Sequence, residues 1–242
     1  MRLRRRRTDD HPVIHQASSM CLSYPDDEIL AAAPLLDDAL AEQSAGDAVD
    51  PLRRFVAHLR GSDATAVRQD YIDTFDLSRK HTLYLTYWTA GDTRRRGTAL
   101  GEFKQRYRDS GFLVDLRGEL PDHLPIVLEF AARVDPVAGA ELLVENRRAL
   151  ELIRLSLLDR HSPYADVLTA ICATLPGESP ADRRAVMAMQ SAPPEVETVG
   201  LEPFDPRLLP ISPSLSAPRA PETSRRRQAP DLSTAQTLSE AR

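Results

Sequence analysis

Apolar residues recur at intervals of three and four through most of the chain, which is the spacing of one buried helix face. The clearest stripes are Ile29, Ala33, Leu36 and Leu40; Leu52, Phe55, Val56 and Leu59; and Leu124, Val127, Leu128 and Ala131. The strict alternation of apolar and polar residues that marks a half-buried strand is absent. The sequence therefore predicts an all-α fold, a single globular domain of about eight to ten helices.

Aspartates stand at three expected helix starts, where a carboxylate can accept hydrogen bonds from unpaired backbone N–H groups. These N-cap candidates are Asp26, Asp63 and Asp135. After the last of them, residues 137–158 keep one apolar register, which predicts a single long helix.

Composition changes sharply beyond Ser191. Nine of the nineteen prolines lie after that position, together with much serine and arginine. Such a segment buries too little apolar surface to offset the entropy of ordering it. We therefore expect a disordered Pro/Ser/Arg-rich tail at 191–242, a basic disordered N-terminus at 1–10 and an all-helical domain at 11–190.

The net charge of −5 conceals an acidic body. Five arginines lie within residues 1–7, and seven acids oppose six arginines from Ala192 onward, which leaves −9 for the residues between. A body this acidic repels phosphate backbones, so we expect no nucleic-acid partner. Because no window approaches the ~20 apolar residues that cross a bilayer, and the arginine-rich start lacks a signal sequence's apolar run, we expect a cytoplasmic protein without membrane insertion.

Metal and nucleotide signatures are missing. Cys21, Cys172 and the six histidines show no spacing typical of a metal site, and we expect the cysteines to be free buried thiols. The motifs GxxxxGK(S/T) and GxSxG are absent. We therefore predict no enzyme activity, no catalytic residue and no bound metal. Two alternatives stay open: a metal-dependent hydrolase built on the adjacent Asp122 and His123, and an all-α adaptor that uses the Pro-rich tail.

The run LYLTYWTAG, residues 83–91, is apolar or aromatic on nearly every side. A helix there must be buried on most sides or must offer one face to a ligand. Its aromatic residues Tyr84, Tyr87 and Trp88 are therefore candidates for the floor of a binding site, with a buried core helix as the alternative.

Three consecutive arginines open the next expected helix: Arg94, Arg95 and Arg96. The helix dipole disfavours cations in a first turn by about 0.3–1 kcal/mol each, so something acidic must offset them. Either the arginines pair with acids such as Asp92, Glu119 or Asp122, or they form a site for an anionic ligand or an acidic partner.

Polar residues gather before an apolar helix in the stretch GELPDHLPIVLEF, residues 118–130. Asp122 can cap this helix, because Pro125 falls in the first turn, where a missing N–H costs nothing. Capping does not explain Glu119, nor why both acids stand beside His123. Two acids at the lip of an apolar helix suit a site that takes the basic end and the hydrophobic body of a peptide.

Several motifs together are similar to those of a known family. ELPDHL resembles the E-x-P-D-H signature of the redox-enzyme maturation chaperones, the TorD/DmsD/NarJ family. The stretches SMCLSYPDDE, YIDTFDLSRKHTLYLTYWTAGDTRRRG and YRDSGF resemble its nitrate-reductase branch. The resemblance covers about residues 12–175 in the family's order and leaves out the Pro-rich tail.

The resemblance implies an all-helical, non-enzymatic chaperone that binds the N-terminal segment of a nitrate reductase α-subunit. It also implies that the client is held until its molybdenum cofactor, bis-MGD, has been inserted, before membrane attachment, and that the chaperone keeps no cofactor itself. The site residues that it carries over are Glu119, Pro121, Asp122 and His123.

To these residues we add an apolar floor from composition: Tyr84, Tyr87, Trp88 and Leu124. The two sets together suggest helix-in-groove recognition of a peptide. The sequence leaves the oligomeric state open, with a monomer as the simplest expectation.

Overall fold

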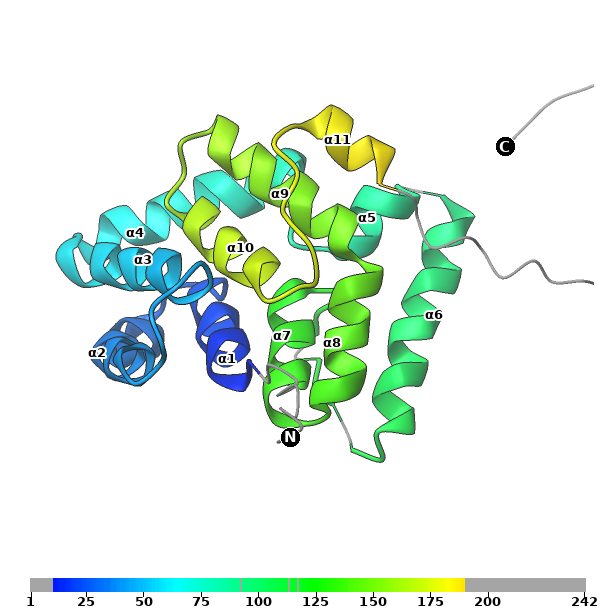
Figure 1. Ribbon diagram of the computed structural model, residues 1–242, viewed down its shortest axis with the longest axis horizontal. Helices are drawn as coiled ribbons and strands as arrows, with labels where there is room; N and C mark the ends of the chain where they lie inside the picture. The colour runs from blue at the N-terminus through cyan, green and yellow to red at the C-terminus, as the bar shows by residue number, and fades with distance from the viewer. Residues whose placement is uncertain (1–10, 92, 113, 117, 190–242) are drawn as a thin grey trace, which may run out of the picture. The chain divides into compact units, whose positions relative to one another are not determined.

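The computed structural model describes residues 11–91, 93–112, 114–116 and 118–189, and within these ranges the regular structure is entirely helical (Figure 1). The α-helices of these ranges are α1 (Pro12–Cys21), α2 (Asp27–Ala41), α3 (Val49–Gly61), α4 (Ala64–Tyr71), α5 (Leu85–Ala90), α6 (Arg94–Asp109), α7 (Leu124–Arg133), α8 (Pro136–Glu145), α9 (Arg147–Asp159), α10 (Tyr164–Ala173) and α11 (Arg183–Ala188). A π-helical turn, η1 (Ile72–Asp76), and a 3-10 turn, η2 (Arg79–His81), connect α4 to α5.

The all-α prediction is confirmed. The described α-helices number eleven rather than eight to ten, because α5 and α11 have only six residues each and are too short to show a repeat. The segments expected to be disordered, 1–10 and 191–242, lie outside the described residues. Among the described helices, none is both long enough and apolar enough to span a bilayer.

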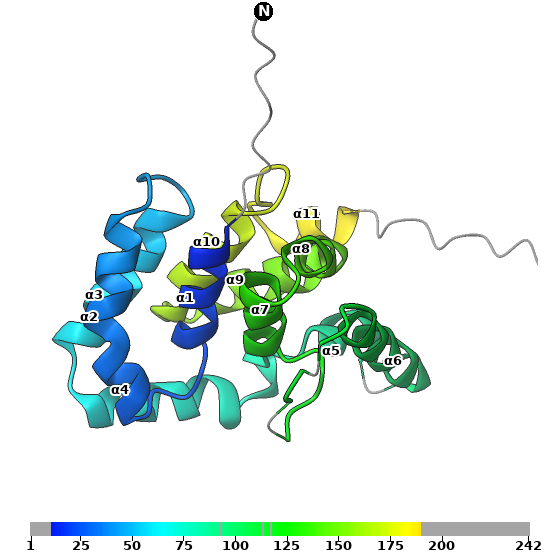
Figure 2. The same cartoon turned by 90° about the horizontal axis from the view of Figure 1, so that it is seen from below.

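Helix α1 is central to the packing. It runs alongside α7, and α2, α3 and α10 pack around the rest of it (Figure 2). Its buried face includes the small residues Ala17 and Ser18, which allow close approach. Next to it, the ring of Tyr164 lies 4.9 Å from that of Phe55 and 6.0 Å from that of Tyr71, measured between centroids, which joins α10 to α3 and α4.

The three predicted N-caps are confirmed. The Asp26 carboxylate accepts the N–H of Ile29 at 2.9 Å, and Asp63 and Asp135 each accept two backbone N–H groups at the starts of α4 and α8. Each cap contributes about 1 kcal/mol to helix stability. The cysteines are also free and buried as expected, and burial raises the pKa of Cys21 to about 12.

The prediction of one helix over 137–158 is wrong, because the chain breaks at Asn146 into α8 and α9. The backbone of Asn146 has φ −99° and ψ 14°, outside the regular helix. Its side-chain amide donates to the carbonyl of Leu142 at 2.9 Å, alongside its own N–H. Asparagine competes in this way for backbone groups and is unfavourable inside helices. The apolar register conceals the break, since buried residues continue on both sides.

A segment that the sequence analysis missed returns across α9, and we call residues 176–180 the C-terminal strap. The Arg147 guanidinium donates to carbonyls of residues 176–178, and Arg154 donates to the carbonyl of Pro180 at 2.6 Å. Between the arginines lies Glu151, which is fully buried and accepts from Arg154 at 2.7 Å. The buried charges are thus paired and hydrogen-bonded, as buried charges must be.

Helix α6 lies at the edge of the bundle and is unusually polar (Figure 1). It buries only Phe103 and Tyr107 and carries six cations against two acids. Two glycines, Gly97 and Gly101, lie within it, and a Cβ at either position would meet no atom within 4 Å. Each glycine costs the helix about 1 kcal/mol relative to alanine, a cost that packing inside the chain does not require.

The crossing of α7 and α8 depends on Gly139, because a Cβ there would lie 2.3 Å from the Cα of Ala131. We predict that Gly139→Ala lowers the free energy of unfolding by about 1–3 kcal/mol or more, as overpacking does. The matched control is Gly101→Ala on the open face of α6, which should raise stability by about 0.5–1 kcal/mol. Urea unfolding measures both, and equal effects of the two changes would contradict this account of the crossing.

Candidate functional site

The two segments singled out from the sequence cross each other in the structure. Tyr84 and His123 form an isolated antiparallel bridge. On either side of it, the N–H of Leu124 donates to the carbonyl of Leu83 at 2.9 Å, and the N–H of Leu85 donates to that of Asp122 at 3.1 Å. Residues nearly forty positions apart are therefore held together by backbone hydrogen bonds, which supports treating them as one site.

Asp122 caps a helix, but not the one expected. Its carboxylate is fully buried and accepts the backbone N–H of Thr86 at 2.9 Å and the Thr86 hydroxyl at 2.6 Å, both through Oδ2. It therefore caps the first turn of α5. The N-cap of α7 is His123, whose side chain makes no capping hydrogen bond, while Pro125 lies in the first turn as predicted. The capping prediction for α7 is wrong because the carboxylate turns toward the neighbouring helix.

Glu119, Tyr84 and His123 form the outer part of the crossing, where Glu119 is exposed and the other two are half-buried. The Tyr84 hydroxyl donates to Oε2 of Glu119 at 2.5 Å, and the rings of Tyr84 and His123 lie 5.1 Å apart. Burial, together with this hydrogen bond, raises the pKa of Tyr84. Burial lowers the pKa of His123, although the charges of Glu119 and Asp122 oppose the shift. Glu119 itself is exposed, so it can meet a partner.

Pro121 and Leu124 lie beneath this surface. The Tyr107 hydroxyl of α6 donates to the carbonyl of Pro121 at 2.7 Å, and Pro121 is buried. Leu124 is fully buried in the core. In this arrangement both residues support the segment from inside, and Leu124 does not line an open floor.

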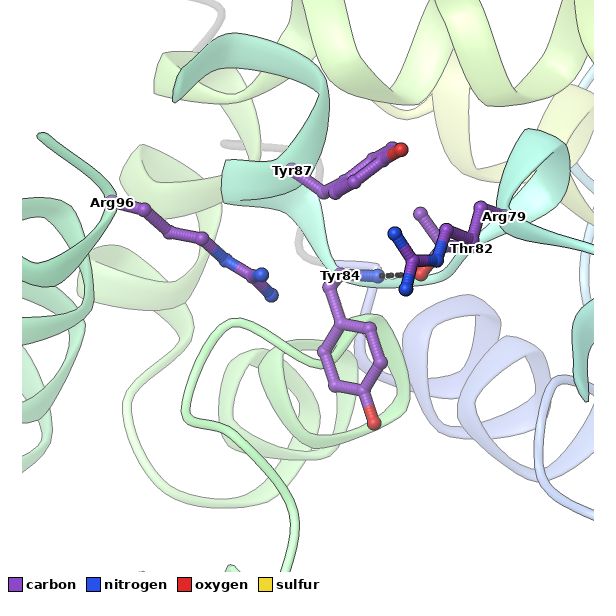
Figure 3. Close-up of a pocket in the computed structure, with 5 residues that line it drawn as sticks. All are labelled: Arg79, Thr82, Tyr84, Tyr87 and Arg96. Atoms are coloured by element: carbon purple, nitrogen blue, oxygen red, sulfur yellow. Dashed lines mark hydrogen bonds between the residues drawn. The ribbon is translucent and has the colours of Figure 1, made fainter. Parts of the chain in front are cut away.

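A pocket of about 240 Å³ adjoins the crossing. Its lining residues come from η2, α5, α6 and the connection before α5, and they are Arg79, Thr82, Tyr84, Tyr87 and Arg96. Figure 3 shows the two guanidinium groups reaching in from opposite sides, with the rings of Tyr84 and Tyr87 between them. Two of the proposed floor residues thus line an opening.

Trp88 follows the second alternative drawn from the sequence, a residue packed against the core, and not the binding floor. Its indole N–H donates to the carbonyl of Thr82 at 3.0 Å, and its ring packs partly against the core. It fixes the connection on which the pocket is built and is not among the lining residues. Arg79 and Thr82 lie within the stretch that resembles the family, but they were not selected as site residues, because that resemblance assigns no role to individual positions of the stretch.

The three arginines at the start of α6 have different surroundings. Nε of Arg96 donates to the Thr86 hydroxyl at 3.3 Å, and its guanidinium lies 5.9 Å from the centroid of the Tyr84 ring. Arg94 and Arg95 are exposed. Asp92, one of the expected partners, lies outside the described residues. Arg96 is thereby linked through Thr86 to the buried carboxylate of Asp122.

The alternative of a hydrolase built on Asp122 and His123 finds no metal site among the described residues. Within them no group of three or more His, Cys, Asp or Glu side chains is placed to hold an ion. The two side chains also have different surroundings, since Asp122 binds Thr86 and His123 stacks on Tyr84.

A double-mutant cycle tests the buried cap. Asp122→Ala leaves the Thr86 N–H and hydroxyl without an acceptor, so we predict a loss of about 1–3 kcal/mol in unfolding free energy. Thr86→Val should couple to it by about 1–2 kcal/mol, because the two groups touch. Thr89→Val, one turn further along the same helix, should show no coupling to Asp122→Ala. Coupling of equal size for both threonines would refute the assignment.

The lowered pKa of His123 makes stability depend on pH. Below about pH 6.5 the unfolded chain takes up a proton on this histidine, whereas the folded chain takes it up only at a lower pH, so the free energy of unfolding falls as pH drops. We predict that His123→Gln loses less stability between pH 7 and pH 5 than the unmodified protein. His58→Gln, a change at an exposed histidine, should leave the loss unchanged, and the same result for both variants would contradict the prediction.

The chain is similar in sequence to proteins of one known family. Residues 38–170 match the family model of the nitrate reductase delta subunit. The nitrate reductase-like protein NarX of Mycobacterium tuberculosis is 44% identical over 162 residues, which are 67% of this chain and 24% of that protein. The chain thus spans about a quarter of that relative's length. A Bacillus subtilis protein described as a nitrate reductase molybdenum cofactor assembly chaperone, NarJ, is 32% identical over 168 residues, 69% of this chain and 91% of that one.

A solved structure supports the fold. It is described as a redox enzyme maturation protein from Archaeoglobus fulgidus, with a TM-score of 0.53 and 22% identity over 67% of this chain and 92% of that one. The family match and the Bacillus subtilis relative confirm the resemblance drawn from the ELPDHL motif and its companions. The chain belongs to the nitrate reductase delta subunit family.

Proposed function

We propose that this protein is a non-catalytic chaperone of nitrate reductase assembly. It binds the N-terminal segment of the catalytic α-subunit in the cytoplasm and keeps that subunit competent for bis-MGD insertion before membrane attachment. The names of the relatives support the chaperone role, since they describe assembly chaperones and not catalysts. In this proposal bis-MGD is the client's cofactor, and the chaperone does not retain it.

The observation that carries the proposal is the pocket beside the E-x-P-D-H segment. Its volume of about 240 Å³ is below the range of about 300–1,000 Å³ typical of small-molecule sites. It therefore suits one anchoring side chain of a peptide better than a whole helix or a nucleotide. This refines the groove expected from the sequence into an anchor site with an exposed rim.

The chemistry of the lining suggests what the client offers. Tyr84 and Tyr87 supply ring surface for an apolar or aromatic anchor, the residue type that most often dominates binding energy. Arg79 and Arg96 suit backbone carbonyls or an acidic side chain. The exposed Glu119, hydrogen-bonded to Tyr84, suits a basic residue next to the anchor. The site thus favours a client segment with an apolar anchor between opposite charges.

Peptide binding tests this function directly. A peptide from the N-terminus of a nitrate reductase α-subunit is titrated against the purified chain by isothermal calorimetry. We predict that Tyr87→Ala weakens binding at least tenfold, because truncating an anchor costs more than about 1.4 kcal/mol. Tyr24→Ala, the same change at a partly exposed tyrosine between α1 and α2, should stay within twofold.

Two results would count against the proposal. If the peptide does not bind to the unmodified chain, the proposed client is wrong. If both tyrosine variants bind the peptide with equal affinity, the pocket is not the binding site. Far-UV circular dichroism of each variant excludes unfolding as the cause of lost binding.

A further inference from the structure

A row of exposed residues runs along the outer face of α6. Their spacing of three, four, three and four positions places them on one side of the helix. We call this row the basic stripe, and it consists of Arg94, Gly97, Gly101, Lys104 and Arg108. From first to last residue it is about 21 Å long at 1.5 Å per residue.

The cations of the stripe differ in their partners from Arg106 of the same helix. Arg106, on the inner side of α6, pairs with Glu141 and Glu145 of α8 at 2.9 and 2.6 Å. Arg94, Lys104 and Arg108 have no such ion pair within the described part of the chain. The stripe itself contains no acid, although Glu102 and Asp109 are exposed on the adjoining side of α6. On a body that carries −9 between residues 8 and 191, such a row of cations favours an acidic partner at this place, and the body repels one elsewhere.

The glycines of the stripe point to a close contact. Neither Gly97 nor Gly101 has a positive φ, and neither meets another part of the chain. Both weaken the helix without serving the fold. Without a Cβ, however, the helix backbone is open, so that a partner's main chain can approach between the charges at the two ends.

We propose that the basic stripe docks an acidic segment of the client nitrate reductase subunit, a second contact beyond the anchor pocket. This inference rests on the proposed function. The stripe begins at Arg94, in the same first turn of α6 as the pocket-lining Arg96 but on the opposite side of the helix, so a chain held in the pocket reaches the stripe by passing around the start of α6. The outer face of α6 exposes no large apolar side chain for insertion into a membrane, and the acidic body disfavours nucleic acid.

Charge reversal separates the two contacts. Lys104→Glu/Arg108→Glu should weaken binding of the purified full-length catalytic subunit at least tenfold, while the isolated N-terminal peptide binds within twofold of the unmodified chain. The control is Arg53→Glu/Arg60→Glu on α3, which changes net charge equally and should keep subunit binding within threefold. Biolayer interferometry at two salt concentrations measures all pairs, and the unmodified chain should lose more affinity with salt than the stripe variant.

A second variant tests the open backbone without changing charge. Gly97→Ala/Gly101→Ala should raise the melting temperature, because alanine favours the helix, and yet weaken subunit binding at least fivefold. If these positions have only a structural role, subunit binding should instead become tighter or stay unchanged. Improved stability together with weaker binding therefore supports docking.

Each remaining outcome overturns the inference. Unchanged subunit affinity in both stripe variants removes the docking surface and leaves the anchor pocket intact. If the stripe variants keep their affinity for the subunit but lose binding to phosphatidylserine vesicles or to a DNA duplex, the stripe binds those partners instead. Failure of the unmodified chain to bind either the subunit or the peptide overturns the proposed function as well, which distinguishes the two failures.

Discussion

The buried carboxylate of Asp122 holds together the crossing on which the rest of the candidate site depends. It accepts both the N–H and the hydroxyl of Thr86 and thereby ties the start of α5 to the segment before α7. A buried carboxylate is costly unless it is hydrogen-bonded in this way. Asp122 of the E-x-P-D-H segment therefore holds the two segments in position. The exposed Glu119, and Tyr84 beside it, face outward.

Charge at the site is arranged differently from the sequence-based interpretation. Glu119 and Asp122 suggested an acidic site for a basic peptide, but Asp122 is enclosed and two arginines line the adjoining pocket. Opposite signs thus lie on either side of Tyr84. Under the proposed function, a client segment has to match both signs in the right order along its chain, and this gives more discrimination than one patch of a single sign.

Local features were predictable, and long-range partners were not. The caps at Asp26, Asp63 and Asp135 depend on N–H groups two or three residues away, so residue type and position suffice. The acceptor role of Asp122 depends on a threonine thirty-six residues distant, and a sequence pattern cannot select that donor over nearer ones. The low helix propensity of asparagine could have indicated the break at Asn146, but the continuous apolar spacing on both sides favoured one helix. Arg79 of the pocket lies inside a family-like stretch, but nothing in the sequence indicated that its side chain lines the site.

The C-terminal strap has a consequence for biosynthesis. Glu151 of α9 is fully buried, and one of its hydrogen-bond donors is Ser179, twenty-eight residues further along. While a nascent chain emerges from the ribosome, this carboxylate has no strap to cover it until synthesis has passed Pro180. Completion of the α9 surface is therefore a late event in folding, and a chain cut just before that proline would leave the Glu151 carboxylate without its serine donor and open to water.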